Sequence, residues 1–343
     1  MTKSINNVDV TDEIADKFLD RVFKPYFKKV KYKSKFTMSG ESSPTSFKGE
    51  LSKECLFDET NYKLEPKNEF IHFTTLQGLD SILESGYLRL SSIENLTDDL
   101  EMTLALNKFK EKIEIEIDDD DITNIKQNIF CLSSCLNTPE TISDTYLWEN
   151  YSKGGSGAAI IFEVENVNPN LLFGKVQYGN DNLSVFEQLT SKIVEFKSEF
   201  EDFMPDNLYE MMSNIFCFHK ANKFHRENEV RLLISDNKYS IYHEHNNLFI
   251  EKVINGSNEL RYIYKLVLDE RMEDWYNKNY SHRKNITLQD AHSEIPKISI
   301  KKIILGYNVK EPWDIIDYLN KKKVKLNMNF EVEYLNNELE INK

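Results

Sequence analysis

The residues whose types are best suited to catalysis or binding lie in the stretch from Phe218 to Ile234. Its last part reads as a strand in which Glu227, Glu229 and Arg231 are two residues apart, so an extended backbone would place all three on one face. Two carboxylates and a guanidinium are costly to bury unless they pair with one another or bind a ligand. The pattern therefore predicts either an ion-pair ladder on a solvated strand or a functional site, and the residues alone leave both open.

A second polar pair lies between residues 70 and 90. Apolar β-formers surround His72 and Thr74, and the two-residue period of a strand puts these two side chains on the same face. Thr75 can cap the helix that follows, and Gly86 can end that helix in the left-handed conformation. The stretch predicts a strand with a buried helix behind it. A lone histidine in such a place is more often an ordinary polar residue of a strand face than a ligand-binding group.

Serines and aromatic residues fill the segment between these two stretches. A predicted strand at 128–135 ends in serines, and a predicted helical turn at 144–152 carries aromatic side chains. The candidates are Ser133, Ser134, Tyr146, Trp148 and Tyr151. The Gly-rich turn at 153–157 lacks the Lys-Ser/Thr pair of a P-loop and the strand–helix context of a dinucleotide fingerprint. We interpret it as a tight connection that brings the backbone close either to a ligand or to the sheet.

The remaining pattern predicts the elements that position these side chains. A long helical stretch at 183–220 carries an apolar stripe and is interrupted by Pro205, which predicts two helices. Strands are expected at 261–268, 298–305 and 330–334, with a helix at 313–320 between the last two. We therefore predict an N-terminal helical extension at 1–65 and one α+β domain at 66–343, with a helical insertion at about 183–220.

Composition narrows the function classes. The chain has 343 residues, 40% of them hydrophobic, and a formal net charge of −14, which disfavours broad non-specific binding to nucleic acid. Its four cysteines form no C-x-x-C pair and have no histidine at zinc-ligand spacing, so they are expected to be buried thiols in a reducing cytosol. The sequence shows no run of eighteen apolar residues, so we predict a cytoplasmic protein without a membrane partner.

The order of the motifs resembles a known layout. H-F-T-T-L-Q-G-L, F-C-L-S-S, Y-L-W-E-N-Y-S-K-G-G-S-G and E-N-E-V-R-L together look like a bacterial conserved domain of unknown function, over about residues 68 to 320. The same order is similar to ADP-ribosyltransferases of the diphtheria-toxin and poly(ADP-ribose) polymerase type, which place His on the first strand, Ser or Tyr in the middle and Glu on a late strand. The resemblance implies a split, mostly antiparallel β-sheet flanked by helices, with NAD as co-substrate and no metal.

The resemblance also implies roles for individual residues. According to this resemblance, His72 would hold a ribose of NAD and Thr74 would lie near the nicotinamide amide. Tyr151 would stack on nicotinamide, Glu229 would be the catalytic carboxylate, and Glu227 would be the first Glu of an E-x-E motif that engages the acceptor. The cofactor-binding set implied in this way is His72, Phe73, Thr74, Ser133, Ser134, Tyr146, Trp148, Tyr151 and Arg231. Such residues suit the chemistry, because a carboxylate stabilises the oxocarbenium-like state formed when the nicotinamide–ribose bond breaks.

Three functions remain open at this point. The resemblance favours an NAD-dependent ADP-ribosyltransferase or NAD glycohydrolase that acts as a bacterial toxin or phage-defence effector on a protein or nucleic-acid acceptor. The first alternative is a non-catalytic module that senses a nucleotide or binds a partner. The second is a metal-dependent nuclease that would use Glu227 and Glu229 with His225 or His219, and the acidic net charge disfavours it.

Overall fold

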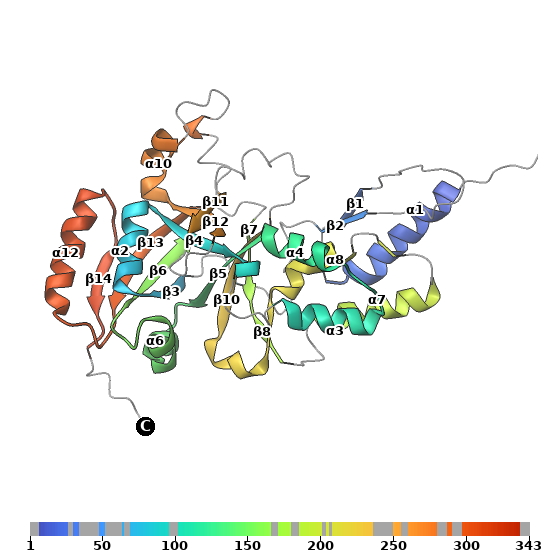
Figure 1. Cartoon of the computed structure of the whole chain (residues 1–343), viewed down its shortest axis with the longest axis horizontal. Helices are drawn as coiled ribbons and strands as arrows, with labels where there is room; N and C mark the ends of the chain where they lie inside the picture. Colours follow the sequence, from blue (N-terminus) through green and yellow to red (C-terminus); the bar gives the residue numbers. More distant parts are fainter. Residues whose placement is uncertain are drawn as a thin grey trace, which may run out of the picture.

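The computed structural model describes residues 7–26, 30–33, 48–51, 64, 69–95, 102–165, 171–179, 185–200, 204–205, 208–235, 250–254, 260–279, 287–289 and 297–336. These residues form helices and strands around one large sheet, so the predicted α+β class is confirmed. Figure 1 shows the sheet in the middle of the molecule with helices on both sides of it.

Six of the described strands close into a ring. They are β3 (Phe70–Thr74), β4 (Tyr87–Ser92), β5 (Ile129–Leu136), β6 (Ala158–Val164), β12 (Leu260–Leu268) and β13 (Lys297–Leu305). Around the ring β12 pairs with β13, β13 with β6, β6 with β3, β3 with β5, β5 with β4, and β4 with β12. Of these six pairings, β12 with β13 is parallel and the other five are antiparallel. The strands therefore form a closed, mixed β-barrel.

This barrel corrects the prediction of a split, mostly antiparallel sheet. The cause lies in β5, whose two edges have different partners. One edge pairs along its length with β10 (Glu229–Ser235). The other edge is divided, because Phe130 and Cys131 pair with β4 whereas Cys135 and Leu136 pair with β3. Since β4 also pairs with β12, the divided edge closes the ring.

Further strands extend the barrel. β7 (Leu171–Lys175) pairs with β10, β11 (Ile250–Ile254) with β12, and β14 (Glu331–Tyr334) with β13. Two small sheets lie apart from it in the pairing scheme. One joins β1 (Val30–Lys33) to β2 (Lys48–Leu51), and the other joins β8 (Gln177–Tyr178) to β9 (His219–Lys220).

One group of helices shares an apolar cluster, which we call the helical cluster. The group consists of α1 (Asn7–Phe18) with a π-helical turn (Leu19–Phe23), α3 (Thr103–Ile113), α4 (Asp119–Asn128), α7 (Val185–Glu199) and α8 (Leu208–Phe216). The break between α7 and α8 confirms the two helices predicted around Pro205. Phe18 of α1 packs edge-on against Phe196 of α7 at 5.0 Å between ring centroids. The N-terminal helix and the predicted insertion therefore share one core.

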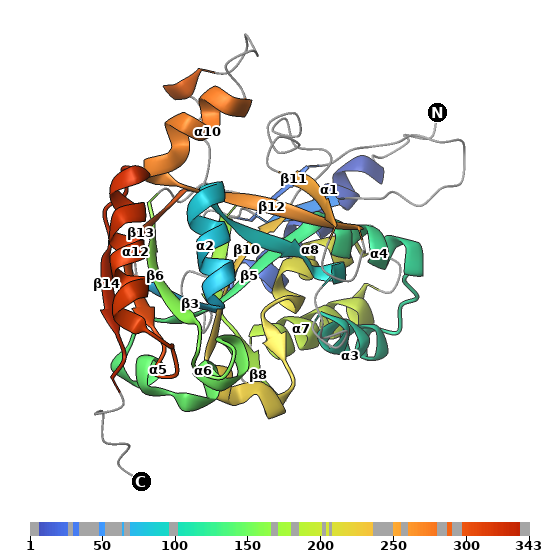
Figure 2. The same ribbon diagram turned by 60° about the vertical axis from the view of Figure 1, so that its left-hand side comes forward.

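A second group of helices covers the opposite side of the molecule. It contains α2 (Leu76–Ser85), α10 (Met272–Asn279) and α12 (Pro312–Lys325), and it packs on a cluster that includes Phe70, Ile160, Phe162, Val230 and Leu232, which we call the α2-side cluster. Figure 2 shows α2 in front of the barrel strands with α12 beside it, away from α3 and α7. Short 3₁₀ segments lie at Ile93–Asn95, Asn222–Glu227 and Asp269–Arg271.

The helix predicted behind the first strand is confirmed. The Thr75 side chain accepts a hydrogen bond from the Gly78 amide at 2.9 Å, so it caps the N-terminus of α2. Gly86 ends the helix at φ +77°, in the left-handed region that glycine adopts without strain. These two residues fix where β3 ends and β4 begins.

A third cluster lies on the other face of the strands, under two short helices. α5 (Pro139–Ser143) and α6 (Thr145–Tyr151) lead into this region. The α6-side cluster consists of Ile71, Phe73, Cys135, Leu147, Trp148, Ala159, Ile161 and Ile304. The described cysteines, Cys131, Cys135 and Cys217, are all buried and lie outside any disulfide. Within the described ranges, we find no helix with the length and apolarity needed to cross a bilayer.

Candidate functional site

Four charged side chains are buried together where β9, β10 and the 3₁₀ turn at 222–227 meet. Lys220, Glu227, Glu229 and Arg231, which we call the charged cluster, are between 0% and 7% exposed. The Lys220 ammonium lies 2.8 Å from a carboxylate oxygen of Glu227 and 2.8 Å from one of Glu229. Lys220 therefore bridges the two carboxylates. Two negative and two positive groups meet in this cluster, which lowers the cost of burying any one of them.

Arg231 holds Glu229 with two nitrogens. Nε of Arg231 donates to Oε1 of Glu229 at 2.8 Å and Nη2 donates to Oε2 at 3.3 Å, while Nη1 donates to the carbonyl oxygen of Cys217. The amide of Glu229 donates to the Tyr178 hydroxyl at 2.8 Å. Burial alone would raise the pKa of Glu229, but the charges of Arg231 and Lys220 outweigh it and lower the pKa to about 2. Glu229 is therefore ionised throughout the physiological range.

Tyr151 connects the charged cluster to the surface. Its hydroxyl donates to Oε1 of Glu227 at 2.5 Å, and 44% of the residue is exposed. Burial of the hydroxyl and its hydrogen bond to Glu227 raise the pKa of Tyr151. The phenol is therefore protonated at neutral pH and can donate. The exposed ring of Tyr151 and the buried carboxylate of Glu227 thus lie side by side.

Helix α6 is tied to the 3₁₀ turn that carries Glu227. The Asp144 carboxylate caps α6 by accepting from the Tyr146 amide at 2.9 Å, and it lies 3.6 Å from a nitrogen of Arg226. The Arg226 guanidinium also lies 4.9 Å from the centre of the Tyr146 ring. These contacts hold α6 against the turn, so Tyr151 at the end of the helix reaches Glu227.

The Gly-rich turn after α6 approaches the sheet. A Cβ added at Gly157 would overlap the carbonyl oxygen of Thr74 and lie 2.9 Å from that of Ser152. The amide of Gly157 donates to the Ser152 carbonyl at 2.8 Å, and the amide of Gly155 donates to the Trp148 carbonyl at 3.0 Å. Of the two interpretations of this turn, close approach to the sheet accounts for Gly157.

His72 lies on the other face of the sheet from the charged cluster. Phe70 belongs to the α2-side cluster, whereas Ile71 and Phe73 belong to the α6-side cluster, so strand alternation places His72 with Phe70. Nδ1 of His72 lies 3.2 Å from the carbonyl oxygen of Ser133. A carbonyl only accepts, so Nδ1 carries the proton and Nε2 presents a lone pair. Burial lowers the pKa of His72, which keeps the ring neutral near pH 7.

The pairing register of β10, β5 and β3 also places the charged cluster and His72 on opposite faces. Glu229 pairs with Cys135, and Cys135 pairs with Ile71, so these three residues point to one face across three strands. Arg231 is on the same face, opposite Ser133, and Leu233 beyond it packs in the helical cluster. The charged cluster therefore lies between two apolar clusters on the α6 face.

The structure brings together some of the predicted site residues and separates others. Tyr151, Glu227, Glu229 and Arg231 meet in one group. His72 and Thr74 share the opposite face, on which the Ser134 hydroxyl is buried without a partner among the described residues, whereas Ser133 is exposed on the face of Arg231. Phe73 and Trp148 pack edge-on at 5.0 Å in the α6-side cluster. Tyr146 contacts Arg226 instead of Glu227.

Three functional neighbours were not predicted from the sequence. Lys220 bridges the carboxylates, Tyr178 accepts from the Glu229 amide, and the Cys135 thiol donates to the Glu227 carbonyl at 3.3 Å. Burial and the nearby carboxylates raise the pKa of Cys135 to about 12, so the thiol is not a nucleophile at neutral pH. One signal pointed to a further cation without identifying Lys220, because two glutamates and one arginine leave a net negative charge that burial must neutralise.

The contacts seen for the two histidines proposed for a nuclease are with groups other than the carboxylates. His219 is buried and packs against Phe186 at 4.9 Å between ring centroids, and burial with the charges of Lys108 and Arg231 lowers its pKa to about 3. His225 is exposed, and its Nδ1 lies 3.0 Å from the carbonyl oxygen of Asn222. The carboxylates themselves face Lys220 and Arg231. This arrangement gives no support to the nuclease hypothesis.

No protein-family model, no curated protein and no solved structure matches this chain.

Proposed function

We propose that Tyr151 and Glu227 form the reactive side of a site that consumes NAD, either by ADP-ribosyl transfer or by hydrolysis. One observation carries the proposal. An exposed aromatic ring and a buried carboxylate lie side by side, joined by the 2.5 Å hydrogen bond from the Tyr151 hydroxyl to Glu227. An aromatic face can stack on nicotinamide, and a carboxylate can stabilise the positive charge that develops on the ribose.

Besides stacking and charge stabilisation, the reaction needs a group that accepts the proton of the nucleophile. The bond between nicotinamide and ribose C1′ breaks with its electron pair leaving on nicotinamide, and a bond forms between C1′ and an oxygen or nitrogen of water or of an acceptor. The nucleophile loses its proton, which Glu227 can accept. Lys220, at 2.8 Å from Glu227, keeps that carboxylate oriented toward Tyr151. The barrier falls because the charge of Glu227 is in place before the reaction begins.

Geometry favours Glu227 over Glu229 as the carboxylate that touches the substrate. Both oxygens of Glu229 are bound by Arg231, and one also lies 2.8 Å from Lys220. Both oxygens of Glu227 are engaged as well, Oε1 by Tyr151 and Oε2 by Lys220, but its partner Tyr151 is exposed whereas Arg231 is buried. In this proposal Arg231 and Glu229 are positioning residues, because Arg231 holds Glu229 and Glu229 holds Lys220. His72 has no part, because strand alternation puts it on the opposite face.

The test uses the purified full chain with NAD, alone and with protein, DNA or RNA as acceptor. We expect nicotinamide release by the wild-type chain, and a loss of about 100-fold in Glu227→Gln, the magnitude typical of removing one transition-state stabilising group. Tyr151→Ala should lower release through lost stacking, while His225→Gln, an exposed neighbour on the same turn, serves as the matched control and should keep wild-type release. Absence of nicotinamide release under all four conditions would refute the proposal.

A specific observation also favours a second candidate, a nucleotide-binding module without turnover. Glu229 is only 4% exposed and is neutralised by two cations, as expected for a structural ion network. This candidate predicts saturable NAD binding in which NAD is recovered intact. Calorimetric titration followed by chromatography of the same sample separates it from the first candidate.

A further inference from the structure

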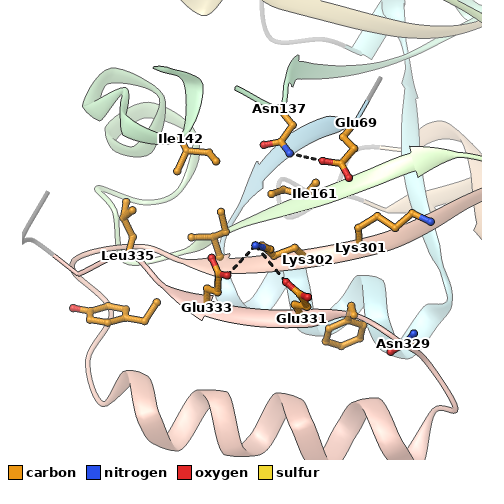
Figure 3. Close-up of a pocket in the computed structure, with 13 residues that line it drawn as sticks. Glu69, Asn137, Ile142, Ile161, Lys301, Lys302, Asn329, Glu331, Glu333 and Leu335 are labelled. Carbon is orange, nitrogen blue, oxygen red and sulfur yellow. Dashed lines mark hydrogen bonds and ion pairs between the residues drawn. The ribbon is translucent and has the colours of Figure 1, made fainter. Parts of the chain in front are cut away.

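A cavity of about 680 Å³ lies on the α6 face of the barrel, separate from the charged cluster. Figure 3 shows it between the start of β3, the strands β6, β13 and β14, and the α5 segment. Its apolar lining comes from Ile142, Ile161, Ile304 and Leu335. Ile142 of α5 lines the cavity, whereas Tyr151 at the far end of α6 contacts Glu227. The two sites therefore share no lining residue.

One wall of the cavity is formed by Glu69 and Asn137, which bind each other. Asn137 Nδ2 donates to Oε2 of Glu69, and the Asn137 amide donates to the Glu69 carbonyl at 2.9 Å, so the two residues are locked together. The bond to a carboxylate fixes which end of the Asn137 side chain is the nitrogen. The other end, Oδ1, is buried without a partner among the described residues. No described lysine or arginine forms an ion pair with Glu69.

The opposite wall is charged but internally paired. Lys302 lies 2.8 Å from Glu333 and 3.3 Å from Glu331, as the dashed lines in Figure 3 mark. The hydrogen bond to Glu333 raises the pKa of Lys302, which is therefore charged at neutral pH. Lys301 pairs with Glu163 at 3.0 Å. The lining has three carboxylates and two ammonium groups, and both ammonium groups are already engaged.

We propose that this cavity binds a small molecule in which an ammonium, amidinium or guanidinium head is joined to an apolar body. The head would donate to the Glu69 carboxylate, which is an acceptor only. The apolar body would contact the isoleucines that line the cavity, Ile142, Ile161 and Ile304. The volume falls within the usual range for small-ligand pockets, about 300–1,000 Å³. The inference does not depend on the proposed NAD chemistry, because no residue of the charged cluster takes part.

Three probes that share a phenyl ring and differ in the charge of the head group test whether binding depends on a positive charge. Benzamidine is a cation, benzamide is neutral and benzoate is an anion. Titration into ¹⁵N-labelled full chain, followed through the Asn137 side-chain amide signal, reports binding at this cavity. We expect saturable binding of benzamidine with a Kd on the order of 1 mM, as for a fragment of nine heavy atoms. Benzamide and benzoate should bind at least about tenfold more weakly. Equal binding of the three probes, or no saturable binding of benzamidine, overturns the proposal.

Two variants with opposite expected effects on benzamidine binding separate a loss of the site from misfolding, because a misfolded variant would not bind more tightly. Glu69→Gln keeps the shape of the side chain and should weaken benzamidine binding about tenfold. Lys302→Met leaves Glu331 and Glu333 without their cation and should tighten it. Glu199→Gln, which removes an exposed carboxylate paired with Arg21 on the helical side, is the matched control and should bind as wild type does. Unchanged binding in both Glu69→Gln and Lys302→Met would overturn the assignment of the head group to these carboxylates.

A peptide arm identifies the source of the cation. n-Butylguanidine and an acetylated, amidated Gly-Arg-Gly peptide carry the same guanidinium head, and both are monocations. We expect n-butylguanidine to bind at least as tightly as the peptide, because the cavity has the size of a small-molecule site. Tenfold preference for the peptide would contradict a small-molecule ligand.

Discussion

At the scale of the residue, the charged cluster depends on every charge having a partner. Arg231 is fully buried, and its guanidinium bonds to Glu229 and to the Cys217 carbonyl. The spacing of Glu227, Glu229 and Arg231 predicted from sequence that these groups would need partners or a ligand. Lys220 could not be placed from spacing, because it precedes the 3₁₀ turn and reaches the carboxylates only through the fold.

Removal of one buried partner should be far more costly than removal of a pair. Arg231→Met leaves the Glu229 carboxylate buried with Lys220 alone, and we expect the free energy of unfolding to fall by about 3–5 kcal/mol. The double variant Arg231→Met/Glu229→Leu should recover most of that loss, because no unpaired charge remains on this strand. Urea unfolding at neutral pH measures both values. A double variant no more stable than the single one would show that the pair itself stabilises the fold.

Buried neutral histidine gives the protein a pH dependence. The folded pKa of His219 is about 3, below its unfolded value near 6.5, so unfolding takes up a proton between these pH values and stability is lost as pH falls through that window. Between pH 7 and pH 5 this should cost about 1–2 kcal/mol.

Two variants isolate that contribution. His219→Gln should show a smaller loss of unfolding free energy over the same pH interval, whereas His225→Gln, at an exposed position, should behave as wild type does. Urea titrations at each pH measure the difference. Parallel pH profiles for wild type and His219→Gln would contradict the prediction.

At the scale of the element, capping residues predicted the ends of helix α2 correctly, whereas the backbone around Glu227 differs from the prediction. Thr75 and Gly86 delimit α2 as their residue types predict. The strand is expected from Asn228, with Glu227 alternating onto the face of Glu229. It begins at Glu229, because Asn228 adopts the left-handed conformation at φ +44° and Glu227 belongs to the 3₁₀ turn. Asparagine tolerates that conformation better than most residues. The break lets Glu227 turn toward Tyr151 while Glu229 remains beside Arg231.

The Gly-rich turn offers a matched pair of glycines. Gly157→Ala would place a methyl group against the backbone oxygens of Thr74 and Ser152, so we expect a loss of about 3 kcal/mol in unfolding free energy. Gly154→Ala has nothing within 4 Å but must adopt φ +68°, which costs about 1–2 kcal/mol. Thermal or urea unfolding compares the two. Equal losses would mean that the approach of Gly157 to the sheet is not a packing constraint.

At the scale of the whole molecule, the α+β class and most strands follow from local patterns, whereas the closed barrel does not. Apolar runs and turn residues predicted where β5, β12 and β13 lie. Closure depends on which strand each edge of β5 accepts, and no local pattern contains that information, since Phe130 and Leu136 pair with different strands. The same long-range register puts His72 and Glu229 on opposite faces. A site argued from motif order alone could not reveal that separation.

The most direct measurement of the central claim follows NAD binding and nicotinamide release in one sample of Glu227→Gln. We expect a Kd for NAD within about threefold of wild type, because Tyr151 still offers its ring, and release slowed about 100-fold, because the charge opposite the ribose is gone. Release at the wild-type rate from this variant, or a loss of NAD binding as large as the loss of release, would contradict the role given to Glu227.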